Sequence, residues 1–89
     1  MSAAIRDERR SELFKFLRTI QKAGLPVETL GERDRLVDSG LIDSLAILQI
    51  VSYLEEAYGI DFSIRGVDPE QLGSIGGILD LIELEKSAA

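Results

Sequence analysis

Hydrophobic side chains recur at helical spacing in residues 3–23, where they lie opposite a basic arc. The apolar stripe consists of Ile5, Leu13, Phe16, Leu17 and Ile20. Gly24 is a residue suited to end a helix, and Pro26 cannot continue one. The pattern predicts a first amphipathic helix over residues 3–23, with a basic face that is solvated.

A second helix is predicted over residues 44–58, which contain no Gly or Pro and are followed by Gly59. Its core-facing stripe is Ile47, Ile50, Val51, Leu54 and Tyr58. Leu45 and Leu48 border the polar arc of this helix, so we expect both to be at least partly exposed. An exposed apolar pair suits the docking of a partner, although single surface leucines are also common.

Two more helix starts follow. Asp68 and Pro69 are typical of the first residues of a helix, here a short one over residues 68–72. Ser74 is the predicted cap of a last helix over residues 74–85, with the core stripe Ile75, Ile78, Leu79 and Ile82. Gly76 and Gly77 each cost about 0.8–1 kcal/mol in a helix interior. Either this first turn frays, or another backbone approaches closely there.

The remaining segments are predicted to be connections. Residues 60–64 alternate apolar and polar side chains, but no second strand is available to pair with them. We therefore expect an extended, partly buried loop there. Residues 25–43 form a long connection with enough apolar anchors, among them Leu25, to be ordered. Together these elements predict an all-α domain spanning residues 1–89. It has three longer helices, one short helix and a long loop between the first and second long helices.

The amino-acid composition excludes most catalytic mechanisms. The 89 residues include no Cys and no His, so a thiol nucleophile, the usual general base and the common zinc ligands are missing. We expect no metal site and no enzyme activity. The net charge of −6 argues against nucleic acid and suits partners with basic patches, or simply solubility. Without a long apolar run or a signal-peptide pattern, we expect a monomeric cytoplasmic protein with no membrane insertion.

Ser44 is the candidate functional residue. It follows a glycine-containing loop and lies at the predicted start of the second helix. Unpaired N–H groups and the helix dipole favour a phosphate or phosphodiester at such a position. By residue type alone, an ordinary helix cap is the more common role for such a serine. No His or Cys is available to activate it. If Ser44 has a chemical role, it is an attachment point that other enzymes modify.

A family resemblance rests on the order Gly40-Leu-Ile-Asp-Ser-Leu45, an apolar helix carrying Glu55 and Glu56, and then Gly59-Ile-Asp-Phe62. With a long anchored loop before it and two helices after it, this order resembles the acyl carrier protein family, including peptidyl and aminoacyl carriers. The resemblance spans nearly the whole chain. It implies a four-helix bundle in which a phosphopantetheinyl transferase attaches 4′-phosphopantetheine from coenzyme A to Ser44.

The resemblance also implies a role. The thiol of the arm would carry an acyl or aminoacyl group as a thioester, supplied by a loading ligase and passed to downstream acyl-transfer enzymes. Asp43 and Leu45 would flank the anchor, and partner enzymes would contact the second helix at Leu45, Leu48, Gln49, Glu55 and Glu56.

The chain departs from the fatty-acid-synthesis type of the family at two positions. That type has acidic residues just after the serine, where this chain has Ala46 and Gln49. Val67-Asp-Pro-Glu also looks more like stand-alone carriers of specialised pathways, so we expect a specialised pathway. The alternative is a helical protein–protein interaction module that is never modified.

Overall fold

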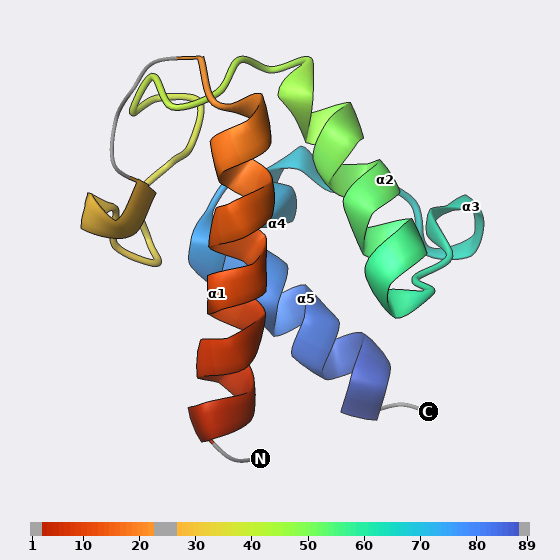
Figure 1. Cartoon of the computed structure of the whole chain (residues 1–89). Helices are drawn as coiled ribbons and strands as arrows, with labels where there is room; N and C mark the ends of the chain where they lie inside the picture. Colours follow the sequence, from red (N-terminus) through yellow and green to blue (C-terminus); the bar gives the residue numbers. More distant parts are fainter. Residues whose placement is uncertain (1–2, 23–26, 88–89) are drawn as a thin grey trace.

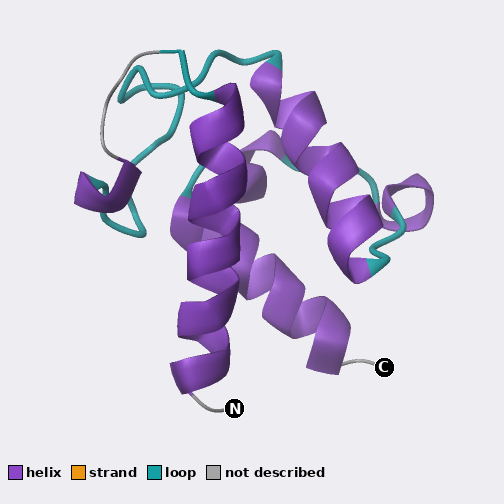
Figure 2. Ribbon diagram, viewed as in Figure 1, coloured by secondary structure: helices purple, strands orange, loops and turns teal. Residues whose placement is uncertain are grey.

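The computed structural model describes residues 3–22 and 27–87, and the regular elements in these ranges are all helical (Figure 1, Figure 2). The three long helices are α1 (Ala3–Ile20), α2 (Ala46–Tyr58) and α5 (Ile75–Ser87). Between them lie a 3₁₀ turn, η1 (Val27–Thr29), and two single-turn helices, α3 (Phe62–Arg65) and α4 (Pro69–Leu72). The all-α prediction is confirmed.

The long helices form a bundle that α4 helps to close. Helix α1 packs against α2 and α5, and α4 packs against both α2 and α5. In Figure 1, α4 lies behind α1, and α3 lies at the outer edge of the molecule beyond α2. The part of the connection that leads into α2 runs across the end of the bundle at which α2 begins. The predicted functional residue therefore lies at one end of the molecule.

The core draws on all the long helices and on the connection before α2. All four residues of the predicted α5 stripe are buried, and Leu81 is buried with them, so α5 is covered over a wider arc than predicted. In α2 the predicted stripe is buried at three positions, while Val51 and Tyr58 are only half-buried. The long connection is ordered, as predicted, and contributes the buried residues Val27, Leu36, Leu41 and Ile42.

Several predicted boundaries shift. Helix α1 ends at Ile20, and the predicted end at residue 23 and the anchor Leu25 lie outside the described residues. Helix α2 begins at Ala46, two residues later than predicted. Helix α4 starts where expected, because the Asp68 side chain accepts a hydrogen bond from the Glu70 N–H. Helix α5 continues to Ser87.

The loop predicted for residues 60–64 is wrong, since these residues include the short helix α3. The Asp61 side chain accepts a hydrogen bond from the Ser63 N–H and so caps a single turn. Phe62 is buried beneath this turn, whereas Ile64 is 84% exposed. The apolar alternation therefore reflects two buried anchors, Ile60 and Phe62, and not a strand. With α3 and η1, the bundle has more short helical pieces than the single one predicted.

Close backbone contact explains the two glycines of α5. The Gly76 N–H donates to the Glu32 carbonyl oxygen at 2.8 Å, and a Cβ built on Gly76 would lie 2.8 Å from the same oxygen. A Cβ on Gly77 would lie 2.0 Å from the carbonyl oxygen of Gln71. Of the two alternatives, close approach is correct. The first turn of α5 is the point at which the long connection and α4 meet.

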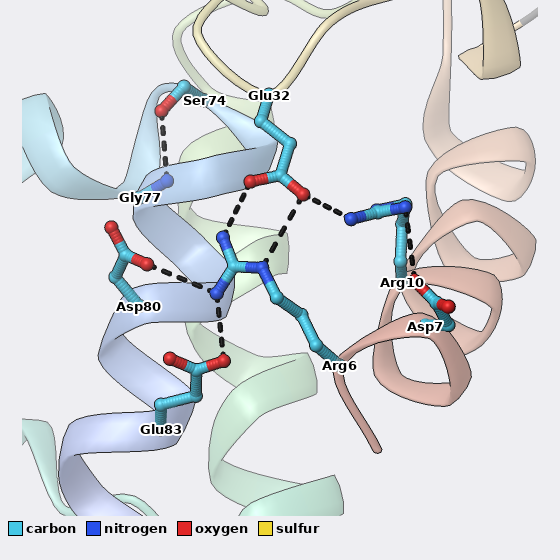
Figure 3. Close-up of polar contacts among 8 residues, drawn as sticks. All are labelled: Arg6, Asp7, Arg10, Glu32, Ser74, Gly77, Asp80 and Glu83. Atoms are coloured by element: carbon cyan, nitrogen blue, oxygen red, sulfur yellow. Dashed lines mark hydrogen bonds and ion pairs between the residues drawn. The ribbon is translucent and has the colours of Figure 1, made fainter. Parts of the chain in front are cut away.

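The basic face of α1 is not simply solvated, which corrects the prediction. Figure 3 shows Arg6 of α1 reaching Glu32 in the long connection and Asp80 and Glu83 on α5. Arg10 also binds Glu32. The hydrogen bond from Arg6 lowers the pKa of the Glu32 carboxyl, and Arg10 acts in the same direction. Glu32 thus joins three segments, through its carboxylate to α1 and through its carbonyl to α5.

Candidate functional site

A hydrogen-bonded loop over residues 35–42 leads to the start of α2. Its first part is held to the α4–α5 junction by the Leu36 N–H, which donates to the Gly73 carbonyl oxygen at 2.8 Å. Its last part is held to the end of α1 by the Lys22 N–H, which donates to the Leu41 carbonyl oxygen. Leu36, Leu41 and Ile42 are buried, and Gly40 turns the chain with φ +85°. These hydrogen bonds and buried side chains fix the positions of Asp43 and Ser44.

Asp43, and not Ser44, caps α2. The Ala46 N–H donates both to the Asp43 carboxylate oxygen Oδ1 and to the Asp43 carbonyl oxygen, each at 3.1 Å. Ser44 and Leu45 form a turn before the helix, and the prediction that the helix starts at Ser44 is wrong. Because a carboxylate is an equally good cap and lies three residues before the N–H it binds, the serine side chain is not needed for capping.

The Ser44 hydroxyl is left exposed at the N-terminal end of a helix. Within the described part of the chain it has no hydrogen-bond partner. The thirteen residues of α2 place the positive end of their dipole beside it. The position combines an accessible oxygen with a local field that favours a negatively charged substituent.

A groove of about 620 Å³ opens beside Ser44. Its walls come from the loop, from α2 and from the α3–α4 region, and they are mostly apolar. The lining residues are Arg35, Val37, Asp38, Ser44, Ile47, Leu48, Val67, Pro69, Glu70 and Gly73. Of the predicted site residues, only Ser44 and Leu48 line it. The sequence reasoning missed the loop and α4 residues, although Val67-Asp-Pro-Glu was noted as a motif and three of its four residues line the groove.

A family model described as "Phosphopantetheine attachment site" matches residues 15–82. The chain belongs to this family. Neither a curated protein nor a solved structure matches the chain. The match covers the loop, α2 and the groove, together with the C-terminal third of α1 and most of α5.

Membership determines the general role of the domain. A domain of this family is the site at which 4′-phosphopantetheine is attached, and it carries groups without catalysing their conversion. This chain is therefore a carrier domain and not an enzyme. Such domains work with transferases and acyl-handling enzymes. In the described residues, no helix has the length and hydrophobicity that crossing a bilayer requires.

The residues at the start of α2 fit a phosphopantetheine arm. Formation of a phosphodiester needs an accessible hydroxyl, and the Ser44 hydroxyl is exposed and without a hydrogen-bond partner among the residues that the structure describes. The helix dipole supplies a favourable field for its charge. The bound group would supply a thiol, which the chain lacks because it contains no Cys. The protein holds the Ser44 hydroxyl at the edge of the groove.

The other predicted contact residues lie on the exposed face of α2 or, for Leu45, in the turn directly before it. Leu45 is 73% exposed and Leu48 is 64% exposed, so the predicted exposure of this pair is confirmed. Gln49, Glu55 and Glu56 are also exposed. Leu48 lies between the Ser44 groove and a second hollow, of about 450 Å³, which Gln49 and Glu56 help to line.

Ala46 differs from its predicted environment. It is only 5% exposed and packs into the core, whereas Gln49 faces solvent. An acidic side chain at position 46 would have to be buried, which is costly without a partner. The comparison with the fatty-acid-synthesis type therefore concerns one surface position in this chain, Gln49.

Proposed function

We propose that Ser44 carries the 4′-phosphopantetheine arm, and that the thiol of the arm holds an acyl or aminoacyl group as a thioester. The observation that carries the proposal is that the Ser44 hydroxyl is accessible and does not cap the helix. It is exposed at the start of α2, and the capping role that would otherwise occupy it is filled by Asp43. The groove beside Ser44 offers the arm and its cargo an apolar surface.

Intact-mass analysis tests this proposal. The protein is incubated with coenzyme A and a broad-specificity phosphopantetheinyl transferase, and one arm mass should be added to the wild type. Ser44→Ala should gain nothing. Ser74→Ala is the matched control, because Ser74 also precedes a helix but is only 8% exposed, and it should be modified like the wild type. An unmodified wild type would instead support the interaction module that is never modified.

We further propose that the partner enzymes bind the exposed face of α2. Leu45 and Leu48 would supply apolar contact beside the anchor. Glu55 and Glu56 would meet basic patches, and Gln49 would contribute an amide in place of a charge. The exposure of all five residues and their position on, or directly before, the helix that follows Ser44 support this surface.

Charge reversal on this face tests the docking proposal. With the double variant Glu55→Lys, Glu56→Lys, association with the transferase should slow, and the dependence of its rate on salt should weaken. The double variant Glu8→Lys, Glu12→Lys has the same net charge but places it on α1, and it should behave more like the wild type. Equal effects from both variants would show that only net charge matters.

The proposed pathway is specialised and not primary fatty acid synthesis. The support is Gln49, an exposed amide where the fatty-acid-synthesis type carries a docking charge. The proposal includes a loading ligase and downstream acyl-transfer enzymes as partners, a monomeric state and a cytoplasmic location. If this is correct, enzymes of primary fatty acid synthesis should use the loaded carrier poorly, and Gln49→Glu should improve its use.

A further inference from the structure

The hollow of about 450 Å³ beside Leu48 is built by two helices, and the proposed function uses only one of them. Its lining residues are Phe16 from α1 and Leu48, Gln49, Ser52, Tyr53 and Glu56 from α2. In the described part of the chain it shares only Leu48 with the groove beside Ser44. This α1–α2 hollow is therefore a separate feature of the surface.

Two stacked aromatic rings supply much of the apolar lining. The ring centroids of Phe16 and Tyr53 lie 4.5 Å apart, and the ring planes are within 10° of parallel. Tyr58 meets Tyr53 edge to face, with the centroids 6.2 Å apart. Burial raises the pKa of the Tyr53 hydroxyl, so the ring is neutral in ordinary buffers. The hollow thus has an uncharged aromatic wall that ring packing holds in place.

The polar lining residues all carry hydrogen-bond acceptors. Gln49, Ser52 and Glu56 follow one another at intervals of three and four residues, which places them on one face of α2. They offer an amide oxygen, a hydroxyl and a carboxylate. In residues 3–22 and 27–87, no Lys or Arg lines the hollow, and the Glu56 carboxylate has no ion-pair partner. The hollow therefore combines an apolar wall with a negative charge that no neighbouring cation neutralises.

An arginine side chain complements this combination. Its aliphatic stem packs on apolar surface, and its planar guanidinium packs against aromatic rings while its five N–H donors bind several acceptors at once. A lysine head group is a more strongly hydrated point charge and makes fewer such contacts. The net charge of −6 further attracts a partner that carries basic residues.

We propose that the α1–α2 hollow receives an arginine side chain of a partner enzyme, with the stem against Phe16 and Tyr53 and the guanidinium at Glu56. The proposal rests on the proposed docking to α2, and it names the group that meets this helix. It adds α1 to the partner surface. It also separates the two acidic residues, because Glu56 lines the hollow and Glu55 does not.

Binding of a blocked arginine tests the hollow directly. N-acetylarginine N-methylamide is titrated into the isotope-labelled protein at low salt, and the backbone amide signals are followed by NMR. Saturable shifts should be concentrated at the lining residues of both helices. The citrulline analogue has nearly the same shape without the charge, and it should bind about two- to fivefold more weakly.

Two pairs of variants locate the site. Glu56→Gln should weaken arginine binding about two- to fivefold, whereas Glu55→Gln makes the same charge change outside the hollow and should leave it nearly unchanged. Ser52→Arg places an arginine of the protein itself in the hollow and should abolish the saturable shifts. Ala57→Arg is its control, because this position is also exposed on α2 but does not line the hollow.

Three outcomes would overturn the proposal. They are shifts spread over acidic residues throughout the protein, equal binding of arginine and citrulline, and equal weakening by Glu55→Gln and Glu56→Gln. These outcomes are distinct from a failure of the proposed function, which would appear as a wild type without the arm. A failure of the wider docking proposal would appear in the charge-reversal variants as an unchanged rate of association.

Discussion

Ser44 and Ser74 both precede helices, and the structure uses them in opposite ways. Ser74 is 8% exposed, and its Oγ accepts a hydrogen bond from the Gly77 N–H at 3.1 Å, so it caps α5. Ser44 is exposed, and its hydroxyl has no hydrogen-bond partner within the described residues. The ordinary role of a serine at a helix start belongs to Ser74. The capping role near Ser44 is filled by its neighbour Asp43.

The two helix starts also differ in how closely other segments pack around them. The start of α5 is crowded by the backbones of Glu32 and Gln71, and it contributes to the closure of the bundle. The start of α2 borders an open groove. The start of α5 therefore contributes packing that stabilises the fold, whereas the start of α2 is accessible to solvent. A group attached to Ser44 need not disturb the packing of the core.

The largest effect is expected at the crowded helix start. Gly77→Ala should lower the free energy of unfolding by about 1–3 kcal/mol, because its Cβ would clash with the Gln71 carbonyl oxygen. This loss outweighs the gain of about 0.8–1 kcal/mol in helix propensity. Gly31→Ala is the control, since its Cβ would lie at an ordinary 3.7 Å from the nearest atom. Urea unfolding compares the two, and a Gly77→Ala protein as stable as the wild type would contradict the close approach.

The two serines should also differ in what their loss costs. Ser74→Ala should lower the free energy of unfolding by about 1–2 kcal/mol, because it leaves the Gly77 N–H without its acceptor. Ser44→Ala should change it by less than about 0.5 kcal/mol. Chemical denaturation of both variants measures the difference. Equal losses would mean that Ser44 acts as a cap after all.

Removing the Asp43 carboxylate should make the two helix starts more alike. Asp43→Ala should cost about 1 kcal/mol of stability, as the loss of a helix cap typically does. The Ser44 hydroxyl then becomes the nearest side-chain acceptor for the helix N–H groups, which competes with modification. We expect slower phosphopantetheine transfer, followed by mass spectrometry, while Asp43→Asn should keep most of the cap.

A smaller loss than that of a helix cap is expected at Glu32, which is partly exposed. Glu32→Gln should lower stability by roughly 0.5–1 kcal/mol at neutral pH. The folded-state pKa of Glu32 lies below the ordinary value of 4.5, so its stabilising contribution is present above about pH 4.5 and is lost as the pH falls through the lower folded value. The difference between wild type and variant should therefore shrink in acid. Urea titrations at neutral and acidic pH measure this, and a constant difference would contradict the role of the charge.

Local patterns were sufficient for much of the fold. The apolar stripes of α2 and α5 and the caps at Asp68 and Ser74 follow from residue type and spacing, and the structure confirms most of them. The prediction for residues 60–64 was wrong because two buried anchors at alternate positions are compatible with a capped helical turn as well as with a strand. Periodicity over five residues does not separate the two.

By itself, the sequence determined the helical class, the lack of a thiol and an imidazole, and the position of an Asp–Ser pair before an apolar helix. These follow from properties of single residues and their near neighbours. Only the tertiary structure decided that Asp43 takes the cap, that Gly76 and Gly77 admit other backbones, and that Arg35 borders the Ser44 groove. The contacts at Gly76 and Gly77 and the position of Arg35 depend on segments that are distant in sequence and meet only when the core is packed. The cap by Asp43 depends on the path of a loop that buried side chains hold in place.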